Sequence, residues 1–329
     1  MKAVKIILLA VGIIVVVVFL VLGYVRFFMP DVAAVEMKVE ITPERVQRGD
    51  YLANHVMVCM DCHSVRDWAL YSGPVTPGTL GAGGDEFTRE MGFPGDFYAP
   101  NVTPYHLGDW SDGEIYRAIT SGVDKDGNPL FPVMPYHSYG KADKEDIFSV
   151  IAYIRSLDPI AKDVPESDPD FPFSLIMRMI PQEADHQTRP PTTNTIEYGE
   201  YLATVAACAD CHTPFEKGQP VTDLLYAGGR EFELPFGTLR GPNITPDMAT
   251  GIGAWTEDVF VNRFKSYDSI HKLDKVNAPM EFNTLMPWNM YGGMKEEDLR
   301  AIYAYLRSLD PVEHEVEKVT YRDRSAKSE

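Results

Sequence analysis

The stretches Cys59-Met60-Asp61-Cys62-His63 and Cys208-Ala209-Asp210-Cys211-His212 decide how this chain folds. Each is a Cys-x-x-Cys-His run, and on a helix the two cysteines lie one turn apart on one face, with the histidine beside them. This spacing is typical of c-type haem attachment, because two thiols can form thioethers to one porphyrin while the next imidazole binds the iron. Each run therefore predicts one covalently bound haem c, with His63 or His212 as the proximal ligand.

A Cys-x-x-Cys pair alone could also be half of a structural zinc site or a redox-active dithiol. The second pair lies 149 residues after the first, and a histidine directly follows each pair, which neither zinc nor dithiol chemistry requires. Structural disulfides are disfavoured because two cysteines only three residues apart would close too short a loop to cross-link the fold. All four cysteines belong to these runs, so no thiol is left as a nucleophile or as a thiolate ligand of iron. The pattern favours two haem groups.

Length and charge narrow the classes of partner. The chain has 329 residues, enough for two ordinary domains beside a membrane segment, and 45% of them are hydrophobic. The formal net charge of −18 argues against nucleic acid and against binding anionic lipid by charge alone. The acidic surface serves solubility, or it attracts a basic docking patch on a redox partner. The sequence leaves both readings open.

Residues 6–25 carry no charge and are almost entirely apolar, so as a helix they match a bilayer core of roughly 30 Å. Aromatic and basic residues follow them instead of a small-residue cleavage site, which predicts an uncleaved anchor over residues 1–30; a cleaved signal is the alternative. Lys2 and Lys5 precede the span, so we expect the amino terminus in the cytoplasm. The haem domains are then expected in the periplasm, tethered to the inner membrane by one span.

From Thr42 the chain is a tandem repeat. We expect a first domain over residues 42–159, a Pro-rich connector over 160–194, a second domain over 195–320 and a polar tail over 321–329. The matched landmarks beside the Cys-x-x-Cys-His runs are Gly49-Asp50-Tyr51-Leu52-Ala53 with Gly199-Glu200-Tyr201-Leu202-Ala203, Ala82-Gly83-Gly84 with Ala227-Gly228-Gly229, Asn101-Val102-Thr103-Pro104 with Asn243-Ile244-Thr245-Pro246, Trp110 with Trp255, and Arg155-Ser156-Leu157-Asp158-Pro159 with Arg307-Ser308-Leu309-Asp310-Pro311.

The periodicity predicts an all-helical fold. In each repeat a first helix is expected to run into the haem motif, and a second to begin after the tryptophan, where Ser111 and Glu114 have capping-box spacing. The last helix should end before Pro159 in the first repeat and before Pro311 in the second. In the connector, the apolar segment 171–180 is interpreted as a strap across the interface between the domains; contact with the membrane or with a partner subunit is the alternative.

A sixth ligand on each iron separates electron transfer from catalysis. Met134 lies 71 residues after His63, and Met286 lies 74 residues after His212. Each methionine is followed directly by proline and stands 21 residues before the arginine of the repeated Arg-Ser-Leu-Asp-Pro. The match predicts Met134 and Met286 as axial ligands. A His/Met pair leaves no open position on iron, so we expect electron transfer without intrinsic catalysis.

These landmarks resemble class I cytochrome c in duplicate. More closely, residues 101–159 with Phe171-Pro172-Phe173 resemble the multihaem cytochrome subunits of membrane-bound quinoprotein alcohol dehydrogenases. Those subunits typically have three haem motifs and are usually attached to the membrane in another way, whereas this chain has two motifs and an amino-terminal apolar segment.

The resemblance also implies which residues surround the haem groups. An indole N–H or an amide near a haem propionate could donate a hydrogen bond to it, and two tyrosines near the ligand methionines invite the same interpretation. Packing under a long loop is the alternative for all of them. The residues concerned are Asn101, Trp110, Tyr139, Asn243, Trp255 and Tyr291.

The sequence thus predicts a membrane-anchored dihaem cytochrome that relays single electrons from a quinol-oxidising complex or a dehydrogenase to a terminal oxidase or a soluble carrier. A haem enzyme of the dihaem peroxidase or thiosulfate-oxidising type is one alternative, although it would need a displaceable or thiolate ligand. A fixed cytochrome subunit of a larger respiratory or dehydrogenase complex is the other.

Overall fold

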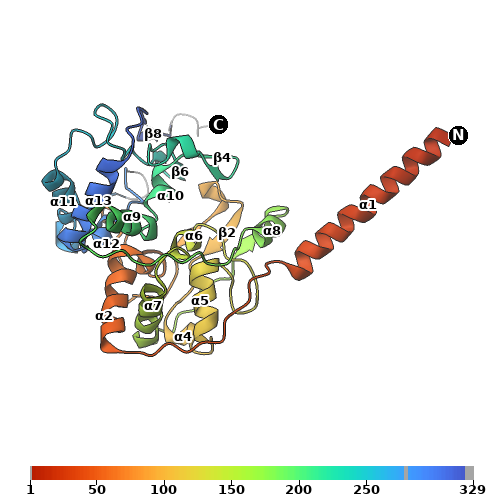
Figure 1. Cartoon of the computed structure of the whole chain (residues 1–329), viewed down its shortest axis with the longest axis horizontal. Coiled ribbons are helices and arrows are strands. Elements are labelled where there is room, and N and C mark those ends of the chain that lie inside the picture. Colours follow the sequence, from red (N-terminus) through yellow and green to blue (C-terminus); the bar gives the residue numbers. More distant parts are fainter. Residues whose placement is uncertain (1, 278–280, 323–329) are drawn as a thin grey trace.

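The computed structural model describes residues 2–277 and 281–322. Its first element, α1 (Lys2–Phe28), is a lone helix that extends away from the rest of the molecule (Figure 1). Its 27 residues, at about 1.5 Å each, make it roughly 40 Å long, and its apolar side chains are exposed except near its end, where Val25 is buried. This length and composition suit a membrane anchor or a signal peptide, in agreement with the predicted apolar span.

The first half of the chain forms a helical unit around the first Cys-x-x-Cys-His run. Helix α2 (Pro43–Tyr51) packs against α7 (Lys144–Ser156), and a Cβ atom at Gly49 would collide with the carbonyl oxygen of Ser149. Glycine therefore permits the close crossing of the two helices. The other helical elements of this half are the π-helical turn η1 (Leu52–Val56), α3 (Cys59–Cys62), the 3₁₀ turn η2 (Arg89–Met91), α4 (Pro104–Leu107), α5 (Asp112–Ser121) and α6 (Tyr136–Tyr139).

The second half repeats this arrangement. Helix α9 (Thr195–Val205) packs against α13 (Glu296–Ser308), and a Cβ atom at Gly199 would collide with the carbonyl oxygen of Ala301. Gly49 and Gly199 thus occupy equivalent crossings, as the repeat predicts. The remaining helical elements here are α10 (Cys208–His212), the 3₁₀ turns η4 (Thr222–Leu224) and η5 (Ile270–Lys272), α11 (Glu257–Lys265) and α12 (Trp288–Gly292).

Helix starts agree with the capping signals. Ser111 and Glu114 form the expected capping box at the start of α5, and the Thr256 side chain accepts from the N–H of Val259 at the start of α11. The last helices end at Ser156 and Ser308, ahead of the prolines that stop them. The expected first helix differs, because it ends before the haem motif. Val58 (φ 47°) and Ala207 (φ 53°) take the left-handed conformation and reorient the chain into α3 and α10.

The prediction of an all-helical fold is correct only in part. Three small antiparallel sheets occur among the described residues, and most of their strands lie in the long loops after the haem motifs, where no helical periodicity runs. Tyr321, which we expected in the polar tail, belongs to a strand, and residues 323–329 of that tail lie outside the described residues. The sheets consist of β1 (Glu86–Phe87), β2 (Gly95–Tyr98) and β3 (Asp168–Pro169), of β4 (Phe215–Glu216) and β5 (Gln219–Pro220), and of β6 (Glu231–Leu234), β7 (Gly237–Arg240) and β8 (Val319–Tyr321).

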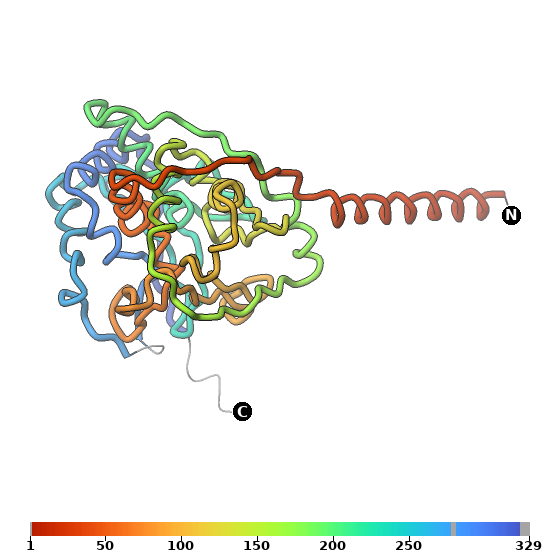
Figure 2. Tube along the Cα trace, turned by 90° about the horizontal axis from the view of Figure 1, so that it is seen from below, coloured from red at the N-terminus to blue at the C-terminus, as the bar shows by residue number. Residues whose placement is uncertain are grey.

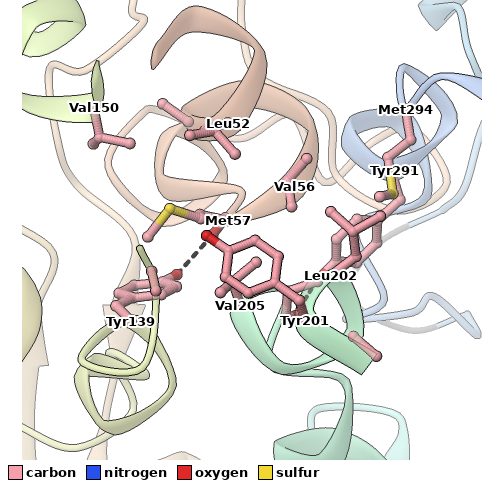
Figure 3. Close-up of a cluster of buried hydrophobic side chains, with 14 of the residues drawn as sticks. Leu52, Val56, Met57, Tyr139, Val150, Tyr201, Leu202, Val205, Tyr291 and Met294 are labelled. Atoms are coloured by element: carbon pink, nitrogen blue, oxygen red, sulfur yellow. Dashed lines mark hydrogen bonds between the residues drawn. The ribbon is translucent and has the colours of Figure 1, made fainter. Parts of the chain in front are cut away.

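The two halves share one hydrophobic core. Side chains of η1, α9 and the segments around α6 and α12 meet in a single cluster, in which Leu52 and Leu202 are completely buried (Figure 3). The contact is reciprocal. Turn η1 of the first half packs against α12 of the second, and α9 of the second half packs against α6 of the first. Each half therefore supports the helix that follows the other half's methionine.

Polar contacts between the halves follow the same reciprocal pattern. Tyr51 donates from its hydroxyl to Asp298 Oδ2 (2.6 Å) and accepts from the backbone N–H of Lys295 (3.0 Å). In the equivalent contact Tyr201 donates to Asp146 Oδ2 (2.6 Å) and accepts from the N–H of Asp143 (3.1 Å). Each tyrosine thus ties its own first helix to the start of the other half's last helix.

The connector follows the outside of the molecule (Figure 2). Its apolar segment forms α8 (Phe173–Ile176) and η3 (Met177–Met179), and Phe173 packs on Phe97 and Phe131 of the first half. Arg178 donates to the carbonyl oxygen of Met29, just beyond α1 (2.6 Å). The interpretation of segment 171–180 as a strap across the interface is therefore wrong, because its aromatic partners all lie in the first half and it contacts the end of α1.

Candidate haem sites

The two Cys-x-x-Cys-His runs form short helices, α3 and α10, in equivalent positions of the two halves. Burial raises the pKa of the Cys59 and Cys208 thiols to about 12, so they are neutral thiols at physiological pH. Within residues 2–277 and 281–322, no three His, Cys, Asp or Glu side chains gather as a metal site. A zinc site would need such a cluster of thiolates and imidazoles, so the geometry favours thioether attachment of a porphyrin.

Each motif histidine has one ring nitrogen engaged by the protein. The Nδ1 atom of His63 lies 2.8 Å from the carbonyl oxygen of Pro100, and that of His212 lies 2.8 Å from the carbonyl oxygen of Pro242. A carbonyl oxygen only accepts, so Nδ1 carries the proton and Nε2 keeps its lone pair for a metal. Burial lowers the pKa of both imidazoles, which also favours the neutral, ligating form. The sequence signal for this contact was a proline before both Asn-x-Thr-Pro landmarks.

Asn101 and Asn243 hold the loop that supplies those carbonyl oxygens. The Asn101 amide donates to the carbonyl oxygens of Ile160 (2.8 Å) and Lys162 (3.0 Å), and its oxygen accepts from Thr103. Asn243 is engaged in the same way, because it donates to Thr250 and Val312 and accepts from Thr245. Both amide protons are used in each case. The two asparagines therefore fix the loop through contacts within the protein, and their place beside a haem propionate stays a prediction.

Tyr139 and Tyr291 connect the methionine segments to the haem motifs. The Tyr139 hydroxyl donates to the carbonyl oxygen of Met57 (2.6 Å), and the Tyr291 hydroxyl donates to that of Ala206 (2.8 Å) (Figure 3). Each acceptor stands two residues before the first cysteine of its run. Burial raises the pKa of both phenols well above the ordinary value, so they remain neutral donors.

Met134 and Met286 lie at equivalent places, each just before a short helix that begins after proline. Both are half-buried and pack against the shared core. Met134 lines the same cavity as Cys59, Cys62 and His63, so the structure brings together all four predicted residues of the first site. In the second half Cys211 also lines this cavity, and Met286 is flanked by two lining residues, Leu285 and Pro287.

The cavity has the size and chemistry for a large acidic cofactor. Its volume is about 2170 Å³, whereas ligand pockets usually measure about 300–1,000 Å³. Trp110 lines it, and the indole Nε1 atom is buried without a hydrogen-bond partner. An unpaired buried donor is costly, so a carboxylate such as a haem propionate fits here. Trp255 is half-buried at the equivalent loop, with its carbonyl oxygen accepting from Tyr303 (2.7 Å).

Two arginines beside the motifs were not singled out from the sequence. Arg66 pairs with Asp61 of the first run (3.0 Å) and with Asp85 (3.5 Å), and its side chain is 4% exposed. Arg230, at the position that repeats Asp85, donates to the carbonyl oxygen of Asp210 (2.8 Å). Burial raises the pKa of Asp61 to about 7, against the opposing effect of Arg66. The sequence did offer one signal for both arginines: an aspartate lies between the two cysteines of each run, where a basic partner could pair with it.

Comparison with known proteins agrees with this geometry. A family model described as cytochrome c matches residues 196–310. The cytochrome c subunit of the quinone alcohol dehydrogenase of Gluconacetobacter polyoxogenes is 30% identical over 85% of this chain and 59% of its own length. The fructose dehydrogenase cytochrome subunit of Gluconobacter japonicus is 30% identical over 80% of this chain and 52% of its own length.

A diheme cytochrome c-type protein of Cereibacter sphaeroides is 26% identical over 78% of this chain and 83% of its own length. The chain thus spans only between about half and three fifths of the length of the two dehydrogenase subunits, but most of the diheme protein. The chain contains a cytochrome c domain, a type of domain that binds haem c covalently, and it is homologous to the cytochrome c subunits of quinone-dependent alcohol dehydrogenases.

Proposed function

We propose that this protein is a membrane-anchored dihaem cytochrome c with two tandem domains, residues 42–159 and 195–320, which relays single electrons on the periplasmic side. One observation carries the proposal. The contacts around the first run recur around the second, including the carbonyl oxygen of proline on His63 and on His212. Only one domain matches the family model, but both halves have the same supporting contacts, and a relative over most of its length is named a diheme cytochrome.

In this proposal Cys59 and Cys62 would attach the first haem, and His63 and Met134 would be the ligands of its iron. Haem c supplies a one-electron couple, which a His/Met pair sets at a raised potential. The residues of this chain do the rest. Pro100 holds the histidine proton on Nδ1, the core excludes water, and Trp110 provides a donor to a propionate.

The second site is assigned in the same way. Cys208 and Cys211 attach the haem, His212 and Met286 are its axial ligands, and Pro242 orients the histidine. With both axial positions taken by the protein, neither iron has a vacant position for substrate. This argues for relay over the peroxidase and thiosulfate-oxidising alternatives.

The anchor and the relatives support the proposed place of the relay. Lys2 and Lys5 before the apolar span favour an amino terminus in the cytoplasm, so that the haem domains lie on the periplasmic side. Phe171, Ile176 and Met179 of the connector are exposed near the end of α1, where a membrane surface would cover them. The dehydrogenase subunits among the relatives favour a dehydrogenase as electron donor, with an oxidase or a soluble carrier as acceptor.

Haem counting and spectroscopy test the ligand set. We expect two haems per polypeptide by pyridine haemochrome, and in the oxidised protein a far-red methionine-to-iron charge-transfer band from two sites. Met134→His and Met286→His should each remove about half of that band, because histidine replaces the sulfur at one iron. One haem per chain, or rapid carbon monoxide uptake by the reduced wild type, would contradict the proposal.

The chain as a fixed subunit of a dehydrogenase complex is the second candidate, and the named relatives favour it. Purification of the full chain from membranes in mild detergent separates the two candidates. Co-elution with a dehydrogenase in constant ratio supports the fixed subunit, and a monomer at full abundance supports a free relay.

A further inference from the structure

One loop of the first half holds the methionine of the second half. Ser72, which follows the first haem motif, donates from its hydroxyl to the carbonyl oxygen of Met286 (2.6 Å). The same hydroxyl accepts from the backbone N–H of Trp288 (2.9 Å). The two contacts fall on either side of Pro287, so a single side chain spans the turn that presents Met286.

Ser72 is itself firmly placed. Its N–H donates to Asn283 Oδ1 (2.8 Å), and the residue is 1% exposed. Its φ of 69° is left-handed, which is uncommon for a residue other than glycine and persists only where surrounding contacts enforce it. Neighbouring backbone pairs dock the same loop on the second half, because Tyr71 donates to the carbonyl oxygen of Asp274 (2.8 Å) and Val276 donates to that of Ala69 (2.8 Å).

Arg66 links Ser72 to the first haem motif. Its Nη2 atom donates to the carbonyl oxygen of Ser72 (2.7 Å), and its Nε atom donates to that of Gly73 (2.8 Å). The same guanidinium pairs with Asp61, between the two cysteines of the first run (3.0 Å), and lies over the Trp68 ring (4.1 Å). A continuous chain of contacts therefore runs from Asp61 through Arg66 and Ser72 to Met286.

In the described part of the chain, Met134 of the first half has no contact equivalent to the one that Ser72 makes with Met286. The carbonyl oxygen of Met134 accepts from the N–H of Tyr136 (2.8 Å), and no described side chain of the second half bonds to it. Met286 has the same local bond, from Trp288 N–H (2.8 Å), and Ser72 in addition. The asymmetry makes the inference testable, because only one of the two sites depends on Ser72.

We propose that Ser72, held in place by Arg66, positions Met286 from the other half of the chain and so couples the sixth ligand of the second haem to the attachment motif of the first. The proposal rests on the proposed function, in which Met286 is an axial ligand. Ser72 is a positioning residue that touches the backbone on both sides of the ligand. Its hydroxyl keeps the methionine turn closed, so that the sulfur competes well against external ligands.

Imidazole binding to the oxidised full chain in detergent tests this. Met134→His leaves the far-red band to Met286 alone, and Met286→His leaves it to Met134 alone. In the Met134→His background, adding Ser72→Ala should lower about tenfold the imidazole concentration at which half of the band is bleached, since two hydrogen bonds on the turn are lost. Adding it to the second background should change nothing. Equal effects in both backgrounds, or none in either, would overturn the proposal.

Two further variants separate the hydroxyl from the backbone. Ser72→Gly also removes the hydroxyl but suits the left-handed φ, so it should match Ser72→Ala in the first background. A wild-type response of this variant would show that the hydroxyl does not hold the turn. Ser138→Ala, at a half-buried serine of α6, is the control and should leave both bands unchanged.

Arg66→Lys tests the link to the first motif. Lysine keeps a positive charge for Asp61 but loses the fork that grips the carbonyl oxygens of Ser72 and Gly73. We expect easier imidazole binding at the second haem, with two haems still attached. A change confined to the first haem would overturn the link. If Met286→His left the far-red band intact, the ligand assignment itself would fail; if it halved the band and Ser72→Ala had no effect, only this inference would fail.

Discussion

The reciprocal tyrosine contacts between the halves give unequal predictions for two equivalent substitutions. Tyr51→Phe and Tyr201→Phe each remove one hydroxyl that bonds a buried aspartate and caps a backbone N–H of the other half. The aspartates differ in their remaining partners. Asp146 keeps two bonds from Arg48 (3.0 and 2.9 Å) and a pair with Arg189. Asp298 keeps the Tyr198 hydroxyl (3.1 Å), and no basic side chain of the described residues forms a salt bridge with it.

The magnitude follows from what each carboxylate loses. A hydrogen bond to a charged group contributes about 1.5–3 kcal/mol, and a buried carboxylate left short of partners adds a desolvation penalty. Asp298 is 3% exposed, so Tyr51→Phe should cost about 3 kcal/mol. Tyr201→Phe should cost about 1 kcal/mol, because two arginines still satisfy Asp146. For the two halves unfolding together through their shared core, as a unit of more than about 150 residues, these costs correspond to falls in Tm of about 6–12 °C and about 2–4 °C.

Thermal unfolding of the haem-loaded full chain in detergent, followed by far-ultraviolet circular dichroism, measures both changes. Tyr105→Phe serves as the control, because this hydroxyl meets Asp163 at the surface and its loss should leave the Tm unchanged. The haem content of each variant is determined first, so that only equally loaded proteins are compared. A Tm for Tyr201→Phe as low as that for Tyr51→Phe, or lower, would refute the reasoning that the arginines compensate.

Three further predictions concern residues inside each half. Gly49→Ala and Gly199→Ala should each lower the free energy of unfolding by about 1–3 kcal/mol or more in urea denaturation, because a methyl group would push the crossing helices apart; Gly12→Ala, in open space on α1, should be neutral. Asn101→Ala should destabilise the first site by about 2–4 kcal/mol and raise the rate of haem-ligand exchange, since buried backbone groups lose their partners; unchanged urea midpoints would contradict this. Trp110→Phe should lower the potential of the first haem in a redox titration by at most roughly 40 mV, the equivalent of about 1 kcal/mol for one electron. A propionate without its donor carries more unshielded negative charge, which favours the ferric state; an unchanged potential would mean that the indole serves packing alone.

The sequence by itself determined the elements that depend on local pattern. The haem motifs, the capping box at Ser111 and the end of α7 before Pro159 each lie within a few residues, so the physical cause is visible in the order of side chains. The duplication was equally readable, because matched landmarks recur in one order. For the same reason the methionine turns could be located through their prolines and their constant spacing to the last helix.

Other features had no local signal. The strands in the long loops are only two to four residues long, too short for an alternating pattern to identify them. The residues with left-handed backbone, Val58 and Ala207, are not glycines, so their conformation has no signal in the sequence. The apolar segment of the connector was interpreted as an interdomain strap. Apolar composition, however, indicates only that a segment is covered and does not identify the residues that cover it. Its partners were decided by the aromatic cluster of the first half.

Only the tertiary structure decided which residues of one half contact the other half. Tyr51 reaches an aspartate 247 residues away, and Ser72 reaches a carbonyl oxygen 214 residues away. A hydrogen bond requires a donor and an acceptor about 3 Å apart with the right direction, and chain order does not constrain that geometry between distant segments. The packing of the apolar faces of the two halves against each other sets this geometry. It therefore also determines which groups the serine and tyrosine hydroxyls can reach.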